Sequence, residues 1–122
     1  MLHMFLLYHD PNEEPSPEIL EGHFAFAREV RQRNAYVTSE ALAGVETAKT
    51  LRVRGGKPLS TDGPFAETKE VLGGYYVLDC RDFDEALEYA AKIPTADTGS
   101  VEIRPVLNVP GWEYSLPGER FS

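Results

Sequence analysis

The sequence predicts a single domain of the α+β class, and three observations support this prediction. Segments with strand-like and helix-like patterns alternate along the chain. The 122 residues are enough for one hydrophobic core but too few for two. Apolar residues make up 42% of the chain and charged residues 26%, a balance typical of folded globular proteins rather than disordered ones.

The net charge argues against one class of partner. Twelve Lys and Arg residues against twenty Asp and Glu residues give a net charge of −8. The resulting field repels phosphate groups, whereas a nucleic-acid-binding protein attracts them. Nucleic acid is therefore not an expected partner.

The start of the chain and its single cysteine indicate the compartment. The apolar run that begins at Met1 has no basic leader, and it ends at His9 and Asp10, too soon to cross a bilayer. Cys80 is the one cysteine, so neither an internal disulfide nor a Cys-x-x-Cys metal site can form. We expect a cytoplasmic protein without membrane contact.

The first part of the chain predicts a strand, a helix and a second strand. Nearly every residue from Leu2 to Tyr8 is apolar, which favours a central strand covered on both faces. Ser16 followed by Pro17 is typical of a helix start. Asn34 can end that helix in a left-handed conformation, and residues 36–42 then favour a strand. The expected apolar stripe of the helix consists of Leu20, His23, Phe24, Ala27 and Val30.

The middle of the chain predicts a β-hairpin. Residues 50–54 alternate between polar and apolar, Gly55 and Gly56 supply a tight turn, and residues 57–61 return. Pro58 lacks an amide donor, and the alternation implies one wet face. We therefore expect the hairpin at the edge of the sheet.

The last part predicts a strand, a helix and a final strand. Residues 72–79 favour a buried strand, and Asp82 is a plausible cap for a helix that Pro94 ends. Residues 101–107 favour a last strand, in which Pro105 indicates an edge or a bulge.

This order of elements contains the ferredoxin-like β-α-β-β-α-β arrangement with an extra β-hairpin. We expect one domain over residues 1–107 and an irregular tail over residues 108–122, whose aromatic side chains Trp112 and Tyr114 need a surface that a dimer partner could supply. Helices would cover one face of the sheet and leave apolar residues such as Met4 and Leu6 on the other. A second copy of the chain would cover that face, so we predict a homodimer.

One segment resembles a known family. Residues 61–70 read TDGPFAETKE, and residues 72–76 read LGGYY. Together they resemble the signature of the DGPF-domain, YCII-related proteins, and the likeness extends over residues 1–107. It implies a dimeric α+β barrel, in which two ferredoxin-like sheets face each other and each protomer has a cleft. Some members of that family resemble small-molecule enzymes, and some are associated with extracytoplasmic-function sigma factors.

His23 is the first candidate for a catalytic residue. It lies on the apolar stripe of the first helix, where an imidazole needs a hydrogen-bond partner. The resemblance implies that a histidine in this helix pairs with an acid, for which Glu40 and Asp62 are the candidates. A neutral histidine beside a carboxylate could move a proton at neutral pH. A hydrogen-bonded structural histidine is the alternative.

Asp62 is the second catalytic candidate, and it also has a purely structural interpretation. Asp62, Gly63 and Pro64 together favour a sharp turn that needs no activity. The alternative is that the turn presents the Asp62 carboxylate at the cleft. The charged residues that follow could equally form a solvated edge. The candidate ligand-binding residues are Glu40, Phe65, Glu67, Lys69 and Tyr76.

No metal or cofactor site is expected. His3 and His9 are separated along a strand by about 20 Å, at about 3.3 Å per residue, which is too far to share a metal ion. The sequence contains no nucleophile elbow, P-loop or dinucleotide-binding fingerprint.

Three functions therefore stay open, of which the third, a dimeric structural protein without a small ligand, ranks below the other two. The first is a cofactor-independent enzyme that transfers a proton on a small molecule between His23 and a carboxylate in a dimer cleft. The second is a metabolite-binding or regulatory module, associated with a sigma factor, that performs no catalysis. The sequence does not separate them, because a fold does not determine an activity.

Overall fold

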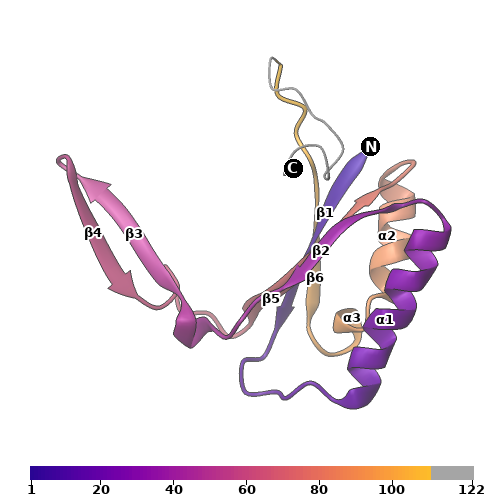
Figure 1. Cartoon of the computed structure of the whole chain (residues 1–122), viewed down its shortest axis with the longest axis horizontal. Helices are drawn as coiled ribbons and strands as arrows, with labels where there is room; N and C mark the ends of the chain where they lie inside the picture. The colour runs from indigo at the N-terminus through magenta and orange to yellow at the C-terminus, as the bar shows by residue number, and fades with distance from the viewer. Residues whose placement is uncertain (111–122) are drawn as a thin grey trace.

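We analysed a computed structural model of the protein, which describes residues 1–110 (Figure 1). The predicted packing of Trp112 and Tyr114 on a partner lies outside the described residues. Within residues 1–110, no helix is long and apolar enough to cross a membrane. The elements are β1 (Leu2–His9), α1 (Pro17–Gln32), β2 (Tyr36–Ala41), the 3-10 helix η1 (Val45–Thr47), β3 (Lys49–Arg54), β4 (Lys57–Asp62), β5 (Val71–Asp79), α2 (Phe83–Lys92), α3 (Thr95–Thr98) and β6 (Ser100–Pro105).

Four strands form the main sheet, in the order β2-β5-β1-β6. Every neighbouring pair is antiparallel. One long helix follows β1 and another follows β5, so the topology is compatible with the predicted ferredoxin-like α+β fold. The edge position of β6 agrees with Pro105, which cannot donate a ladder hydrogen bond.

The hydrophobic core lies between the sheet and the helices, which occupy the same side of the sheet in Figure 1. On β1, His3, Phe5 and Leu7 are buried and alternate with half-buried residues, as expected when one face of a strand is covered. The other core residues come from α1, from β5 and from α2 and its ends. They are Phe26, Val30, Ala35, Tyr76, Leu78, Cys80, Ala86, Tyr89, Ala90 and Ile93.

No helix of residues 1–110 covers the opposite face of the sheet. Met4 lies opposite Val77, and Leu6 lies opposite Tyr75, so these side chains share that face. Met4, Leu6 and Tyr75 are only half-buried. The apolar run in β1 predicted a strand covered on both faces, but the helices in the described part of the chain cover one face only. We call the uncovered side the open face.

The start of α1 confirms the sequence signals, but its packed side differs from the prediction. The Ser16 hydroxyl accepts a hydrogen bond from the Ile19 amide at 3.1 Å, and Asn34 has a φ of 59° beyond the helix. Leu20 and Phe24, predicted to cover the sheet, are 53% and 52% exposed.

The packed side of α1 instead follows Gly22, Phe26 and Val30, which are spaced four residues apart. A Cβ atom on Gly22 would lie 2.8 Å from Cγ of Pro94. The missing side chain therefore lets the helix approach the α2–α3 segment and turns Leu20 and Phe24 to the side.

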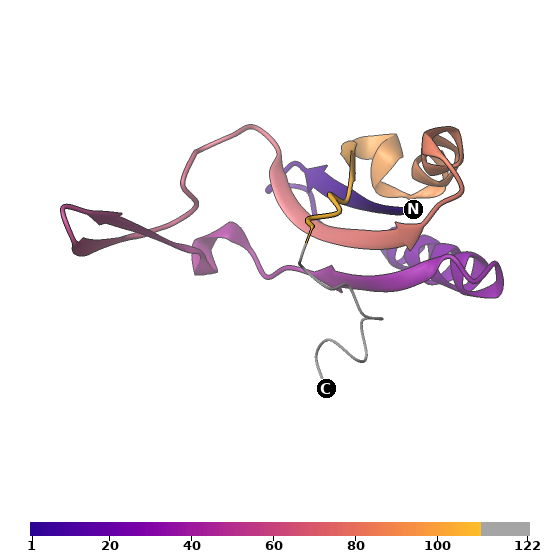
Figure 2. The same cartoon turned by 90° about the horizontal axis from the view of Figure 1, so that it is seen from above.

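The β3–β4 hairpin forms as predicted, but its expected place at the edge of the main sheet is wrong. It makes a separate two-stranded sheet, and every residue from 51 to 62 is exposed. The connections over residues 42–48 and 63–70 carry it away from the body of the protein, as Figures 1 and 2 show. We call residues 49–62 the arm.

We predict that Gly99→Ala destabilises the protein. A Cβ atom at position 99 would overlap the backbone carbonyl oxygen of Tyr8, which cannot move without disturbing β1. The free energy of unfolding should fall by about 1–3 kcal/mol in urea denaturation. Gly44→Ala is the matched control, because its Cβ would meet only the flexible Glu46 side chain. Equal stability of the two variants would contradict this packing.

Candidate functional site

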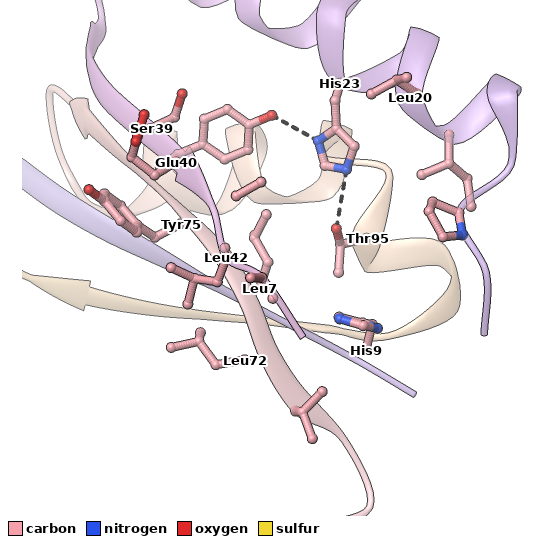
Figure 3. Close-up of a pocket in the computed structure, with 18 of the residues that line it drawn as sticks. Leu7, His9, Leu20, His23, Ser39, Glu40, Leu42, Leu72, Tyr75 and Thr95 are labelled. Carbon is pink, nitrogen blue, oxygen red and sulfur yellow. Dashed lines mark hydrogen bonds between the residues drawn. The ribbon is translucent and has the colours of Figure 1, made fainter. Parts of the chain in front are cut away.

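A large pocket opens between the first half of α1 and one end of the main sheet (Figure 3). Its volume is about 1000 Å³. Its walls come from β1, α1, β2, β5, α3 and the segments over residues 11–15 and 42–46. Apolar side chains that line it include Leu7, Ile19, Leu20, Phe24, Leu42 and Leu72. A mostly apolar pocket with a few polar groups is the usual form of a small-molecule site.

His23 is hydrogen-bonded through both ring nitrogens in this pocket. Its Nδ1 lies 2.8 Å from the Tyr76 hydroxyl, and its Nε2 lies 3.5 Å from the Thr95 hydroxyl (Figure 3). The His23 and Tyr76 rings are stacked, with centroids 6.0 Å apart. The first bond is short and well placed, whereas the second is at the limit of a hydrogen bond. Tyr76 is therefore the group that orients the imidazole.

Secondary structure brings this pair together. His23 lies in the second turn of α1, one turn before the buried Phe26. Tyr76 lies on the helix-covered face of β5, where the Phe26 ring packs against it edge to face at 5.1 Å. Packing on Phe26 therefore fixes the tyrosine ring, and the ring fixes its hydroxyl under His23.

Two adjacent glycines shape the floor of the pocket. A Cβ atom on Gly74 would lie 2.8 Å from the backbone oxygen of Glu40, and one on Gly73 would lie 2.5 Å from the His9 ring. The pairing of β1 with β5 shifts by one residue at this point. Side chains here would push β2 and His9 away, so the glycines keep the end of the sheet compact beneath the cavity.

Both members of the His23–Tyr76 pair are uncharged at neutral pH. Burial lowers the pKa of His23 below its ordinary value of 6.5. Burial, with a smaller contribution from Tyr36, raises the pKa of Tyr76 to about 12. A neutral imidazole has an unprotonated ring nitrogen, so His23 is able to accept a proton.

The predicted candidates divide into two groups. His23, Glu40 and Tyr76 line the pocket. In residues 1–110 the hydrogen-bond partners of His23 are hydroxyl groups, and no hydrogen bond or ion pair joins it to Glu40 or Asp62. Within the described residues, the acid partner implied by the family resemblance is thus not hydrogen-bonded to His23.

The other candidates lie outside the pocket. Asp62 ends β4 in the arm, where its 91% exposed side chain lies 3.7 Å from Lys49. Phe65 is 79% exposed, and Glu67 and Lys69 are also exposed. Gly63 has a φ of 95°, which fits the interpretation of this segment as a sharp turn. The chain therefore does not bring Asp62 to its own His23.

Sequence reasoning missed several polar residues of the pocket, among them Thr95 and His9. Thr95 belongs to the short helix α3, which no periodic pattern announces. His9 lines the pocket from the end of β1, and no sequence pattern points to this role. Within the part of the chain that the structure describes, no three His, Cys, Asp or Glu side chains cluster closely enough to hold a metal ion.

Comparison with known proteins identifies relatives of this chain. The family model of the YCII-related domain matches residues 1–110. An uncharacterized protein of Rhizobium meliloti (strain 1021) is 36% identical over 114 residues, which cover 87% of this chain and 92% of that protein. These matches extend over the sheet, the helices and the arm.

We predict that His23 makes stability depend on pH below neutrality. Its pKa is lowered on folding, so the unfolded chain takes up a proton near pH 6.5 while the folded chain does so only at lower pH. Acidification through this window therefore favours unfolding. In thermal denaturation, the stability advantage of the wild type over His23→Asn should shrink from about pH 7.5 to about pH 5.5.

The wild type and His23→Asn share every other titratable group. The difference between their stabilities therefore removes the contribution of those groups. An advantage that stays constant or grows on acidification would show that folding does not lower the His23 pKa.

Proposed function

The chain belongs to the YCII-related family, and we propose that its His23 pocket binds a small organic molecule and moves a proton on it without a cofactor. One observation carries the proposal: a neutral imidazole, oriented by Tyr76, forms part of the wall of an open and mostly apolar cavity. General bases that work at neutral pH need this combination of position, protonation state and access to substrate.

The hydrogen bond to Tyr76 would set the direction of proton transfer. In the tautomer that can act as a base, Nδ1–H donates to the Tyr76 oxygen, and the lone pair of Nε2 faces the side of Thr95. Nε2 would take a proton from a C–H group beside a carbonyl of the substrate. The electron pair left on carbon would delocalise onto the carbonyl oxygen. Return of the proton to the substrate would complete an isomerisation or an exchange.

The pocket walls favour a substrate with an apolar portion. Leu20 and Phe24 lie at the pocket with about half of their surface exposed, so an apolar group placed against them would leave water. Two arginines also line the pocket, but both have contacts within the chain. Arg28 lies 3.4 Å from Glu21, and Arg31 stacks on the Tyr36 ring at 4.4 Å.

A binding module without catalysis is the second candidate function. The observation that favours it is that the partners of His23 are neutral hydroxyl groups. Without a carboxylate, the imidazolium formed by proton transfer gains less stabilisation. The same pocket would then hold a metabolite unchanged, as in a regulatory protein.

We also propose that the protein works as a homodimer in which two open faces pack on each other. Met4, Leu6 and Tyr75 are half-buried on this face, and helices of this chain do not cover them. Removing apolar surface from water is the main driving force of association. This arrangement corresponds to the dimeric α+β barrel expected from the sequence.

Deuterium exchange tests the proposed proton transfer without a known substrate. A panel of small ketones, keto acids and esters is incubated with the protein in heavy water, and loss of the α-proton signal is followed by proton NMR. A compound that exchanges with the wild type should exchange about 100-fold or more slowly with His23→Gln. Tyr76→Phe should cost about 2–10-fold, as expected for one hydrogen bond.

Glu88→Gln, on the exposed side of α2, is the control and should exchange like the wild type. Equal exchange in His23→Gln would rule out His23 as the base. A panel compound that raises the melting temperature without exchanging would favour the binding module.

The oligomeric state tests the open-face dimer. We expect a mass of twice 13.6 kDa in light scattering and a concentration-dependent dissociation on dilution. Met4→Asp should raise the dissociation constant at least about 10-fold, because it places a charge in an apolar interface. Leu87→Asp, on the exposed side of α2, should have no effect. A wild type that stays at 13.6 kDa at all concentrations would refute the dimer.

A further inference from the structure

We propose that the arm of each chain clasps the second copy in the dimer. This inference rests on the proposed homodimer and adds the contact that the arm makes. It assigns a role to a segment that the His23 pocket does not use.

Within residues 1–110, the arm does not pack on the body of its own chain. Every residue from 51 to 62 is exposed, including Leu51, Val53 and Leu59. Two hydrogen bonds hold its foot: the Gly63 amide donates to the Ala48 carbonyl at 2.8 Å, and the Thr50 hydroxyl donates to the Gly63 carbonyl at 2.9 Å. An isolated two-stranded hairpin is marginally stable in water. A docking surface outside the chain would supply the missing stabilisation.

The two faces of the arm have different chemistry. The register places Val53 opposite Pro58 and Leu51 opposite Ser60, so one face carries an apolar patch. Arg54 lies opposite Lys57, and Arg52 lies opposite Leu59, so the other face is mainly basic. Such an amphipathic hairpin can bury its apolar face on a partner, while the positive charge of its other face adds a long-range attraction to an acidic partner.

Charge complementarity identifies the second copy as the partner. The arm contains Lys49, Arg52, Arg54 and Lys57 against Asp62, a net charge of +3. Because the whole chain has a net charge of −8, the remainder carries −11. A positive arm is therefore attracted to the negative body of another copy. The surface it would reach includes Glu40 and Glu102, which lie beside Tyr75 and Leu6 in the register of the open face.

The position of the arm suits this contact. In Figures 1 and 2 the helices lie at one end of the molecule and the arm at the other, with the main sheet between them. In Figure 1 the arm projects from the ends of β2 and β5 toward the side of the sheet that faces away from the helices, which is the side of the open face. A second chain that packs on the open face would lie next to the arm, and two-fold symmetry would repeat the contact.

The same geometry accounts for the exposed segment at the foot of the arm. Asp62 and Phe65 lie beside the turn at Gly63, outside the pocket of their own chain. With the arm against the second copy, the bulky Phe65 ring, 79% exposed in one chain, would lie near the contact between chains.

Photo-crosslinking tests the contact directly. Val53→Cys is labelled with benzophenone maleimide, while Cys80 stays unlabelled because it is buried and burial raises the pKa of its thiol to about 11. Chains that carry benzophenone are mixed with unmodified chains enriched in ¹⁵N, and the mixture is illuminated. We expect crosslinks between unlike chains, to peptides from β1, β2 or β5. Crosslinks confined to single chains would overturn the proposal.

A paired substitution measures the contribution of the apolar face. Leu51→Asp combined with Val53→Asp should raise the dimer dissociation constant at least 10-fold, while Leu87→Asp leaves it unchanged because α2 lies on the far side of the sheet. If the variant with both arm substitutions dimerises with unchanged affinity, the proposed contact of the arm is wrong, whereas the open-face dimer is not contradicted. A wild type that is monomeric at all concentrations would overturn both.

Discussion

One constraint underlies this structure: a β-sheet has two faces, and the described chain supplies helices for one. The covered face holds the core around Phe5, Leu78 and Val30, each with no exposed surface. The open face carries apolar side chains that are only half-buried. The position of the pocket, the proposed dimer and the proposed role of the arm all follow from this asymmetry, because each concerns an edge or face that the helices leave uncovered.

The candidate site lies where the helical cover ends. Helix α1 packs on the core through Gly22, Phe26 and Val30. Leu20 and Phe24 lie on a neighbouring side of the helix and therefore do not pack on the sheet. The resulting cavity has apolar walls and a polar pair, His23 and Tyr76, at its side. Burial keeps both groups uncharged at neutral pH, which suits an imidazole that accepts a proton.

The sequence predicted local structure well and spatial relations less well. The Ser16 cap, the left-handed Asn34 and the hairpin turn depend on neighbouring residues, and each has the predicted form. The detachment of the hairpin was not predicted, because alternation describes a strand but not the sheet that it joins. His23 and Tyr76 were both selected as candidates, yet their hydrogen bond depends on how α1 sits over β5. Thr95 had no pattern to reveal it, since a four-residue helix is too short for periodicity.

The central claim is that Tyr76 holds His23 as a neutral base with its proton on Nδ1. ¹⁵N NMR of the His23 ring at neutral pH tests this most directly, because the shifts of the two ring nitrogens report which of them carries a proton. The account predicts a neutral ring with protonated Nδ1 and unprotonated Nε2. A positively charged ring, or a neutral ring protonated on Nε2, would contradict it.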